Sequence, residues 1–554
     1  MYKQNKSRKW WGLAIVLLAA FMDILDTTIV NVAVPSVQRN LHMTYAAVQW
    51  VTAGYILAFS LFLITGGRLG DIYGRKRAFI VGIAGFTLAS LLSGVAPNAG
   101  VLIAARLLQG AMAAIMVPQI LATIQVNFLE AERGKVLALY SAITGLASVA
   151  GPLFGGLLIK ANLFGWDWRT IFLVNVPIGI IGIVGALITL DNSRSSKKTK
   201  LDMLGVTLVT GAMLLLVYPL VQGRELGWPL WTYIAMASSV GVFSLFIWYE
   251  RLRNNTQQTP LILFSPFRLR SFWGGLVTIW TFGAGISSFL LMFSIWMQAG
   301  LGFSAVHAGL TFLPFTVGIG MAAGIAGSKY ANHLTRRVLH SGTSLIIAGL
   351  LVLIFTLRHY GASTTTWEVT PALLMYGAGF GLVIVSLFNF ILTGLKPNEA
   401  GSASGLVNTL QQLGGAVGIA IIGVIFFGFI GSLSTQNASL YAPDIRDNLR
   451  SQHIPEIALE PIVDSFQTCF HDRSTEKNPT AIPASCTPAT ETNSPLAAHV
   501  QDLLTRTGVI ANKQNLTDAF SRTLWVEIGI YVLMFNAISL LPGRAHKPEG
   551  VMAL

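Results

Sequence analysis

The sequence predicts an all-α integral membrane protein with fourteen transmembrane helices. Of its 554 residues, 53% are hydrophobic and only 11% are charged, and the mean hydropathy of +0.62 lies above that of soluble globular proteins. Apolar runs of about twenty residues, the length that a helix needs to cross roughly 30 Å of hydrocarbon, recur along the whole chain. The third observation is that the basic residues fall on alternate loops between these runs.

The apolar runs are long enough to be membrane-spanning helices. The first run is full length and contains two aspartates, whereas the apolar region of a cleaved signal peptide is shorter and uncharged, so we expect it to remain as a span. The predicted spans are residues 11–34, 46–66, 79–96, 101–125, 136–159, 171–190, 203–222, 230–249, 272–299, 306–328, 341–357, 369–394, 402–430 and 521–541.

The distribution of lysine and arginine predicts how the chain is oriented. If the N-terminus is cytoplasmic, 24 of the 37 basic residues lie on the cytoplasmic side, and the short outer loops carry only five. Cytoplasmic loops are enriched in basic residues, so both termini are expected on the cytoplasmic side of a cell (plasma) membrane. This bias also explains the formal net charge of +13 without any nucleic-acid partner.

Composition also suggests a division of the chain. The polar, basic stretch DNSRSSKKTKLD separates the first six spans from the rest, and the basic turn that follows Gly67 recurs, shifted by 260 residues, after Gly327. The alternative is that these are two unrelated cytoplasmic loops, each enriched in basic residues because it faces the cytoplasm. The expected parts are an N-terminal six-helix half (1–190), a cytoplasmic linker (191–202), two extra transmembrane helices (203–249), a C-terminal six-helix half (272–541) and a cytoplasmic tail (542–554).

The segment 431–520 between the last two spans is rich in proline, serine, threonine and asparagine. With its short amphipathic pieces, it is expected to form an external loop or a small hairpin. It contains the only two cysteines, Cys469 and Cys486, which on the outer side of the membrane can form a disulfide or remain free.

A dense group of charges lies in the cytoplasmic turn between the second and third spans, in the stretch GRLGDIYGRKR, residues 67–77. Its glycines permit a sharp reversal, and its aspartate can begin a helix or pair with an arginine. A plain basic anchor would need neither feature. The pattern G-x-L-x-D-x-x-G-R-K resembles the signature turn of the major facilitator superfamily, which latches the two halves of those proteins together. The resemblance implies a cytoplasmic gate made by Gly67, Asp71, Gly74, Arg75 and Arg77.

Further stretches resemble motifs of the fourteen-span drug:proton antiporters of that superfamily, which include multidrug and quaternary-ammonium efflux pumps. The resemblance covers nearly the whole chain except 431–520, and the stretches occur in the family's order. They are LDTTIVNVAVP (25–35), RLLQGAMAA (106–114), GLASVAGPLFGG (145–156), WRTIFLVNVPIG (168–179) and QAGLGFSAVHAGLTFLP (298–314).

The fifth span contains a cluster of small residues around a proline. Glycines spaced four apart let a neighbouring helix approach closely, and proline bends the span, although glycine and proline are common in membrane helices generally. The cluster matches the antiporter pattern, so we expect a helix bend formed by Gly145, Gly151, Pro152, Gly155 and Gly156.

Few charged residues lie inside the spans, and each one costs at least about 2.5–3.5 kcal/mol on insertion scales unless it finds a partner. Asp26 and Arg106 lie at comparable depths, roughly 13 and 10 Å from the outer ends of their spans, so they are expected to meet. Such a pair can load and release a proton when it opens and closes, or it can simply hold two spans together. Asp23 lies about 60° from Asp26 around the same helix and is either an accessory proton or cation site or a protonated packing residue.

Glu527, two turns into the last predicted span, is a further accessory candidate for proton coupling. Because it lies near the outer surface, the simpler expectation is that its carboxylate reaches water.

The resemblance implies proton-driven efflux of amphipathic, often cationic drugs by alternating access. The candidate residues for proton coupling are Asp26, Arg106 and Asp23, of which the family motif contains Asp26 and does not require Asp23. No nucleotide-binding loop, enzyme motif or metal-ligand spacing is found in the sequence, so we expect no enzyme activity, metal or cofactor, and the proton gradient as the energy source. The expected partners are a small-molecule substrate, protons and the lipid bilayer, and the protein is expected to be a monomer. Two alternatives are a dedicated exporter of an endogenous metabolite, antibiotic or siderophore, and a non-transporting membrane scaffold or sensor.

Overall fold

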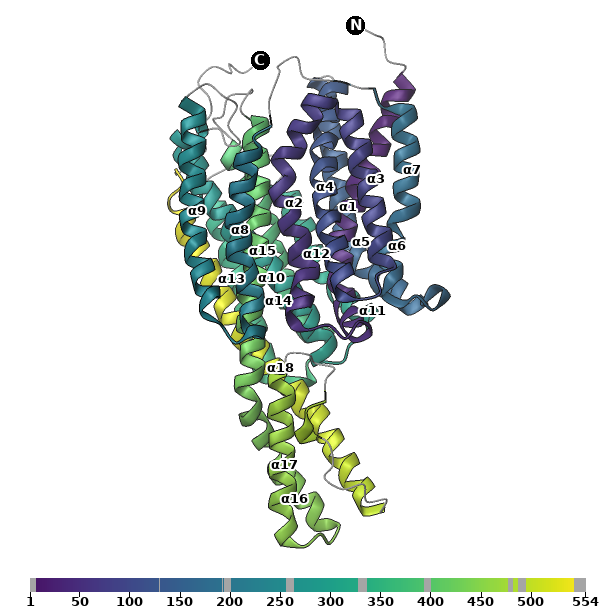
Figure 1. Ribbon diagram of the computed structural model, residues 1–554, viewed down its shortest axis with the longest axis vertical. Coiled ribbons are helices and arrows are strands. Elements are labelled where there is room, and N and C mark those ends of the chain that lie inside the picture. Colours follow the sequence, from purple (N-terminus) through teal and green to yellow (C-terminus); the bar gives the residue numbers. More distant parts are fainter. Residues whose placement is uncertain are drawn as a thin grey trace.

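The computed structural model is a bundle of long helices that run side by side, with a helical extension at one end (Figure 1). The described residues contain no β-strand. They are residues 6–128, 130–191, 193, 201–255, 264–326, 336–392, 400–476, 482–486 and 495–542. The linker is therefore described only at its ends. The second copy of the expected repeat, at Gly327, lies outside the described residues.

The first part of the chain forms a group that we call the N-terminal set. Its sixth predicted span, 171–190, is divided between a short helix and a longer one, and two 3₁₀ turns, η1 and η2, precede it. The set consists of α1 (Lys6–Asn40), α2 (Tyr45–Tyr73), α3 (Arg75–Gly94), α4 (Ala99–Asn127), α5 (Glu130–Ala161), η1 (Leu163–Gly165), η2 (Asp167–Arg169), α6 (Thr170–Leu173) and α7 (Asn175–Thr189).

The last part of the chain forms the C-terminal set. Its first helix ends in a turn of π-helix, η4, and its second predicted span is broken after Thr311. The set consists of α10 (Arg270–Ile295), η4 (Trp296–Gly300), α11 (Ala305–Thr311), α12 (Leu313–Ala326), α13 (Arg336–Tyr360), α14 (Thr366–Leu392), α15 (Ala400–Leu440) and α18 (Pro495–Ile538).

The two sets repeat one packing pattern. In the N-terminal set α1 packs on α4, α5 and α7, and in the C-terminal set α10 packs on α14, α15 and α18. Likewise α4 lies against α2 and α3, as α14 lies against α12 and α13. The sets meet where α2 packs on α15 and where α5 packs on α11. Each set is thus built like the other, and two equivalent helix pairs join them.

Two further helices, α8 (Met203–Leu226) and α9 (Leu230–Asn255), occupy the region expected to hold the two extra helices. They pack on each other, and α8 also lies against α2 and α15. Asp202 caps α8 by accepting a hydrogen bond from the backbone of Gly205 at 2.9 Å, and it accepts another from the Tyr249 hydroxyl of α9 at 3.0 Å. A single carboxylate therefore fixes the start of α8 and joins it to α9.

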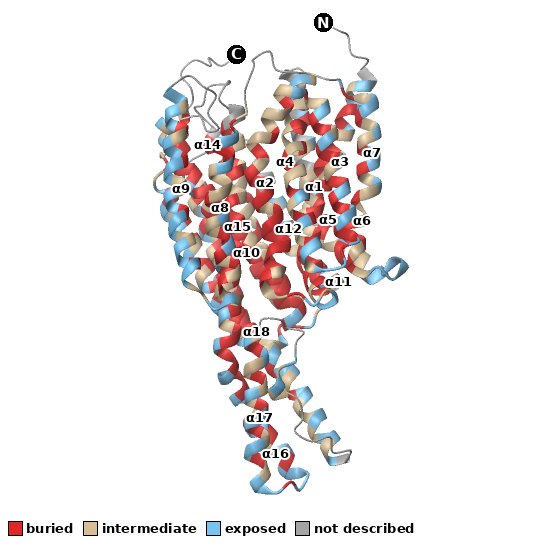
Figure 2. Cartoon of the chain, viewed as in Figure 1, coloured by how far each residue is buried: buried red, intermediate tan, exposed pale blue. Residues whose placement is uncertain are grey.

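The outward faces of the bundle are apolar, as a bilayer requires. Figure 2 shows the buried residues gathered between the helices and the exposed ones on their outer faces. Large hydrophobic side chains on these outer faces are exposed, among them Leu88, Ile188 and Leu230. So many exposed apolar side chains mark a lipid-facing surface, because soluble proteins rarely expose large apolar patches to water.

Thirteen helices among the described residues are long and apolar enough to cross a membrane. The expected fourteenth span, 521–541, falls in α18, where Arg522, Glu527 and Asn536 interrupt the apolar residues. This part of α18 packs within the bundle on α10 and α13, and it returns the chain from the helical extension to the end of the bundle where α1 begins.

The segment expected as an external loop or hairpin is folded into helices instead. The helix α15 continues to Leu440 and α18 begins at Pro495, and between them lie α16 (Ala442–Ser451) and α17 (Glu456–Thr475). A small core of its own holds this extension together, because its helices turn apolar faces toward one another. The core includes Ile445, Leu449, Leu459, Val463, Phe470 and Ala511.

Covalent and ionic contacts add to that core. Cys469 and Cys486 form a disulfide. Two arginines of α16 reach carboxylates of α17: Arg446 meets Glu460 and Arg450 meets Glu456, both at 2.8 Å. The hydrogen bond from Arg450 lowers the pKa of the Glu456 carboxyl. The two ion pairs join α16 to α17, and the disulfide joins α17 to the turn that contains Cys486.

The start of α1 and the extension lie at opposite ends of the bundle (Figure 1). If the N-terminus is cytoplasmic, a membrane-impermeant maleimide should label Cys469 and Cys486 in intact cells once a reductant has opened the disulfide. A Cys469→Ala/Cys486→Ala protein with one cysteine introduced by Arg251→Cys, in the last turns of α9 and at the same end as the start of α1, should be labelled only after cell lysis. Labelling of the introduced cysteine in intact cells, with Cys469 and Cys486 labelled only after lysis, would show that the N-terminus is outside.

Candidate functional site

A buried ion pair joins α1 to α4 near the middle of the N-terminal set. The Nη1 of Arg106 lies 2.5 Å from Oδ2 of Asp26, and the exposed fractions of the two side chains are 1% and 0%. This contact confirms the pairing expected from depth. In hydrocarbon, each of these charges is tolerated only because the other neutralises it.

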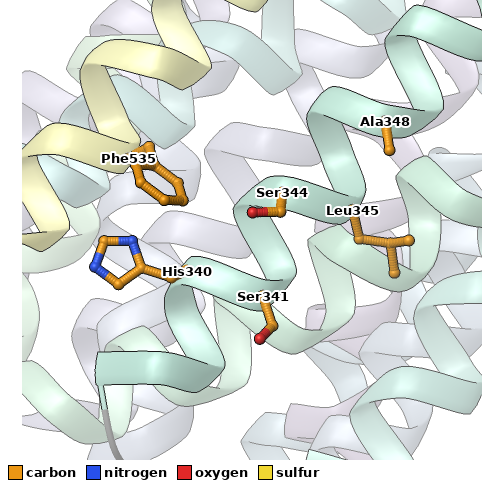
Figure 3. A pocket seen from close by; sticks show the side chains of 6 residues that line it. All are labelled: His340, Ser341, Ser344, Leu345, Ala348 and Phe535. Carbon is orange, nitrogen blue, oxygen red and sulfur yellow. The ribbon is translucent and has the colours of Figure 1, made fainter.

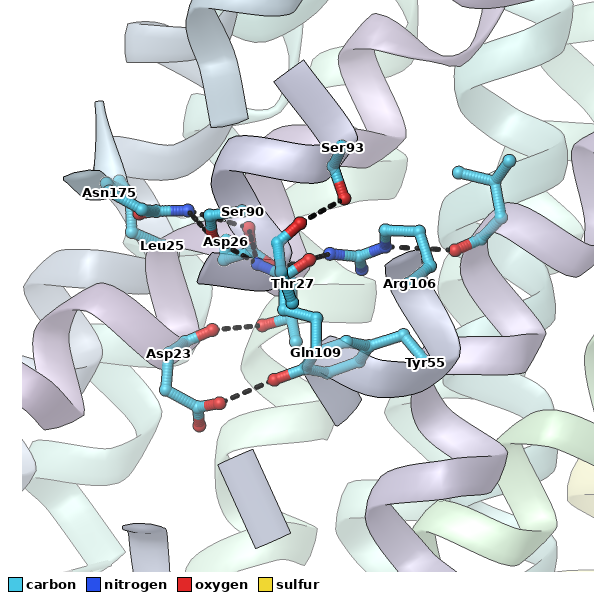
Figure 4. Close-up of polar contacts among 12 residues, drawn as sticks. Asp23, Leu25, Asp26, Thr27, Tyr55, Ser90, Ser93, Arg106, Gln109 and Asn175 are labelled. Carbon is cyan, nitrogen blue, oxygen red and sulfur yellow. Dashed lines mark hydrogen bonds and ion pairs between the residues drawn. The ribbon is translucent and has the colours of Figure 1, made fainter. Parts of the chain in front are cut away.

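Polar side chains from α3, α4 and α7 complete this ion pair (Figure 4). Gln109 accepts a hydrogen bond from Arg106 at 2.6 Å and donates one to Oδ1 of Asp26 at 2.8 Å. Asn175, at the start of α7, donates to the same Oδ1 at 2.8 Å, and Ser90 of α3 accepts from Gln109 at 2.7 Å. The ionised form of Asp26 is thus held by one cation and two amide donors.

Gln109, Ser90 and Asn175 were not predicted as members of the site. Gln109 and Asn175 lie inside stretches that matched the family motifs, and each is an amide in an apolar run. An amide in an apolar run was the sequence feature that could have identified Gln109 and Asn175, because a buried amide in a membrane needs a polar partner.

Asp23 is connected to the ion pair through a tyrosine. The Tyr55 hydroxyl donates to Oδ1 of Asp23 at 2.6 Å, and the Tyr55 ring lies 4.3 Å from the Arg106 guanidinium. Both Asp23 and Tyr55 are buried. Asp23 therefore lies beside the ion pair, as expected from its position on α1, but it has a neutral donor where Asp26 has a cation.

The expectation that Glu527 reaches water is wrong. Its side chain is 1% exposed, and its Oε1 accepts a hydrogen bond from the Ser288 hydroxyl at 2.6 Å. The cause is that α18 packs against α10, α13 and α15, and the sequence of the span alone does not reveal this packing.

The glycine-rich turn 67–77 is compact, and Gly74 is its pivot. Gly74 has a φ of 102°, which favours glycine, and it separates α2 from α3. Asp71 lies 3.5 Å from Arg75, and the Arg75 backbone N–H donates to the Ser193 carbonyl at 3.0 Å. The turn is thus attached to the end of the linker.

The remaining two residues expected in this gate are Arg77 and Gly67. Arg77 is exposed. A Cβ on Gly67 would meet only the side chain of Pro118, at an ordinary contact distance of 3.8 Å. The compact part of the turn is therefore the stretch from Asp71 to Arg75.

The small residues of α5 lie where helices approach closely. A Cβ on Gly155 would come within 2.8 Å of Ile29 of α1, one on Gly156 within 2.6 Å of Val306 of α11, and one on Gly151 would collide with Thr28. These contacts leave no room for a larger side chain on this face of α5.

Two members of the expected bend differ from these three glycines. At Gly145 a Cβ would meet nothing within 4 Å, so this position does not require glycine for packing. Pro152 lies inside α5 and faces α11, where a Cβ on Gly309 would collide with the Pro152 carbonyl.

An open groove of about 470 Å³ lies elsewhere, on the surface formed by α13 and α18. Figure 3 shows its lining side chains, His340, Ser341, Ser344, Leu345, Ala348 and Phe535. The groove shares no residue with the ion-pair network or with the Glu527 contact. Among the described residues, no group of three His, Cys, Asp or Glu side chains could hold a metal ion.

The membrane-spanning bundle, its two similarly packed helix sets and the buried charges between its helices define a multi-pass membrane transporter. The chain belongs to the Major Facilitator Superfamily, whose family model matches residues 16–419.

Relatives named as a transporter, a resistance protein and a resistance and export protein support this class. The chain is 36% identical to a probable actinorhodin transporter of Streptomyces coelicolor, over 98% of this chain and 93% of that protein. It is 34% identical to the puromycin resistance protein pur8 of Streptomyces alboniger, over 76% and 82% of the two chains. It is 31% identical to the tetracenomycin C resistance and export protein of Streptomyces glaucescens, over 77% and 78%.

Solved structures show the same fold. A bacterial homologue of the human lysosomal transporter Spinster, in an inward-facing and unoccupied conformation, superposes with a TM-score of 0.56 at 14% identity, over 97% of this chain and 98% of that one. A structure described as a study of proton dependent oligopeptide transporters gives a TM-score of 0.57 at 11% identity, over 96% and 99%.

Removing the cation alone should destabilise the protein. In Arg106→Ala the Asp26 carboxylate loses its counter-charge while it stays buried, and breaking a buried pair in this way costs about 3–5 kcal/mol. The free energy of unfolding, measured by denaturant titration in detergent micelles, should fall by that amount. The matched control is Asp26→Asn/Arg106→Gln, which removes both charges and should lose much less. Equal losses for the two proteins would contradict the prediction.

Enlarging Gly156 should separate α5 from α11. Gly156→Val places side-chain atoms where Val306 already lies, whereas Gly145→Ala places a methyl group in open space. Spin labels at the exposed positions Leu157 and Leu310 report the separation by pulsed electron resonance. We expect a longer, broader distance distribution for Gly156→Val and an unchanged one for Gly145→Ala, and an unchanged distribution in both would refute close packing here.

Proposed function

We propose that this protein is a proton-coupled exporter of amphipathic small molecules, some of them cationic, that works by alternating access. In this proposal the chain crosses the plasma membrane fourteen times as a monomer, with both termini cytoplasmic and residues 431–520 outside. The parts are the N-terminal half 1–190, the linker 191–202, the extra helices 203–249, the C-terminal half 272–541 and the tail 542–554. The observation that carries the proposal is the buried pair of Asp26 and Arg106.

The proton step follows from the surroundings of Asp26. While Arg106, Gln109 and Asn175 hold the carboxylate, its charge is compensated and it has no need of a proton. If a rearrangement moves α4 away from α1, the same carboxylate loses its cation in a low-dielectric region and takes up a proton instead. Opening and closing of the pair can therefore alternate with proton uptake and release, and Asp23 lies close enough to assist.

Contacts between the helix sets support alternating access. Toward the end that carries the extension, Ser294 donates to the Asn31 carbonyl at 2.5 Å and Gln298 donates to the Val32 carbonyl at 2.9 Å, from α10 and η4 to α1. Together with the glycine contacts of α5 and α11, they close this end of the interface. We propose that the turn 67–77, with Asp71 and Arg75, latches the opposite end in the other state.

The relatives' names favour antibiotics among amphipathic substrates. Proteins named for actinorhodin, puromycin and tetracenomycin C match along most of this chain. The name of the actinorhodin relative, which matches 98% of the chain, favours the alternative of a dedicated exporter of one endogenous compound.

Proton coupling is tested with Asp26→Asn in proteoliposomes that carry an imposed pH gradient. A panel of chemically diverse compounds first identifies one that the wild-type protein moves uphill. Asp26→Asn should abolish this uphill movement, because the amide cannot exchange a proton, while downhill movement of a neutral compound persists. Asp23→Asn should have a smaller effect, since Asp23 makes no ion pair with Arg106 in the structure. Uphill efflux by Asp26→Asn at the wild-type rate would remove Asp26 from the mechanism.

A further inference from the structure

A second buried carboxyl group, in the C-terminal set, has surroundings that differ from those of Asp26. The Ser288 hydroxyl of α10 donates to Oε1 of Glu527 at 2.6 Å. The other oxygen, Oε2, is buried and has no hydrogen-bond partner among the described residues. Nor does any lysine, arginine or histidine of the described part of the chain form an ion pair with this carboxyl group. Glu527 is therefore a carboxyl group in the membrane with one neutral donor and no counter-charge.

Two tyrosines extend this group of polar side chains. Tyr531 lies one helical turn after Glu527 on the same face of α18, and its hydroxyl lies 2.7 Å from the hydroxyl of Tyr376 on α14. Both tyrosines are buried. The rings of Phe289 and Phe315 lie 4.4 and 5.5 Å from the Tyr376 ring, so aromatic side chains enclose the hydroxyl pair. We call Ser288, Glu527, Tyr531 and Tyr376 the C-terminal cluster.

The helices α10, α14 and α15 bring no cation to Glu527. The helix α15 has no titratable side chain, and α10 has only Arg270, at its first residue. On α14 the titratable groups are Tyr376 of the cluster and Glu368, which lies in the first turn and accepts a hydrogen bond from Thr365. Neither Glu368 nor Tyr376 can supply a positive charge.

The basic residues of α13 form no described ion pair with Glu527. Arg337 and His359 are exposed, and Arg336 donates to the Ser539 carbonyl just beyond the end of α18. Arg358 is exposed and lies over the ring of Trp525 at 5.8 Å. His340 lies against the ring of Phe535, two turns beyond Glu527, at 4.3 Å. A charge on Glu527 would thus be uncompensated, which costs several kcal/mol in an apolar interior.

The C-terminal cluster occupies the place that corresponds to the Asp26 network. That network joins α1, α4 and α7, and the cluster joins α10, α14 and α18, the helices that pack in the same way in the other set. Asp26 lies 18 residues into its span, as Ser288 does in α10. Gln109 lies ten residues into α4, as Tyr376 does in α14. Equivalent positions at equivalent depths therefore carry polar side chains in both sets.

We propose that Glu527 is a second proton-binding site of the transport cycle, located in the C-terminal set. The inference rests on the proposed proton-coupled export. In the arrangement seen here the carboxyl group holds a proton and accepts from Ser288, whereas Asp26 is ionised against Arg106. When α18 moves relative to α10, water reaches Glu527, the O–H bond breaks and the proton passes to that water. A hydronium ion on the other side of the membrane then returns a proton to the carboxylate and re-forms the O–H bond, and no redox step is needed.

The difference between the two carboxyl groups explains why one protein would keep both. Asp26 has a cation and two amide donors, so its ionised form is the satisfied one. Glu527 has a single hydroxyl donor, no counter-charge and a buried second oxygen without a partner among the described residues, so burial favours its neutral form over its ionised form. In this one conformation Asp26 carries no proton and Glu527 carries one. A conformational change that reverses both states would link proton binding in one set to proton release in the other.

Infrared spectroscopy of the purified full-length protein tests the protonation without any substrate. At neutral pH, the difference spectrum between the wild-type protein and Glu527→Gln should contain the carbonyl band of a protonated carboxyl group. Glutamine has the size of the protonated acid and its carbonyl can still accept from Ser288, so this variant should fold. The matched control is Glu456→Gln in the extension, whose difference spectrum should contain no such band, because the hydrogen bond from Arg450 lowers the pKa of the exposed Glu456 carboxyl. A difference spectrum of Glu527→Gln without the band would overturn the proposal.

Transport then tests whether the proton is coupled. In proteoliposomes clamped at zero membrane potential, with a gradient of one pH unit and ethidium as the probe, each coupled proton contributes about tenfold to the limiting concentration ratio. Glu527→Gln should lower this ratio about tenfold. If Glu527→Gln reaches the same limiting concentration ratio as the wild-type protein, Glu527 has no role in coupling, although its protonation would still stand. Absence of gradient-driven movement of ethidium and of every compound of the panel by the wild-type protein, with the infrared band still present in the difference spectrum, would count against the proposed function and leave the proton site standing.

Discussion

A charge inside a bilayer must be neutralised within the protein, and this requirement determines how the N-terminal set is built. Asp26 and Arg106 are placed on helices that pack directly against each other, and their exposed fractions of 0% and 1% show that bulk solvent reaches neither. The amides of Gln109 and Asn175 donate to the carboxylate oxygen that Arg106 leaves open. Because an unpaired charge in this position is so costly, the relative placement of α1, α4 and α7 is fixed by one carboxylate.

The sequence could predict much of this arrangement because the relevant signals are local. Three features follow from sequence positions alone: the length of the spans, the alternation of basic loops, and the depth of Asp26 and Arg106. The pairing was therefore predictable, and the structure confirms it. The same holds for the close approach at Gly151 and Gly155, which follows from their spacing on one helix face.

What the sequence could not predict depends on neighbours that are distant along the chain. Glu527 looked like a group near water because only its depth in the span was known, whereas its burial depends on α10, α13 and α15. The segment 431–520 was expected to form an external loop or a small hairpin, because its composition is polar and its amphipathic pieces are short. Its helices form because Ile445, Val463 and Phe470 meet in a small core, and each helix alone shows only a part of that core. In both cases tertiary packing overrides the local signal.

The ion pair inside the N-terminal set is more costly to separate than the uncharged contacts that lie between the sets, and this difference permits motion at their interface. Ion pairs such as Asp26 with Arg106 join helices of one set, and separating such partners in an apolar region is costly. The described contacts between the sets include glycine against backbone, as at Gly156, and single hydrogen bonds to carbonyl groups, as from Ser294 and Gln298. Water can replace a hydrogen bond to a carbonyl when an interface opens, at a net cost of about 1 kcal/mol each. The interface between the sets can therefore open and close at a lower cost than the ion pair within the N-terminal set, as the proposed alternating access requires.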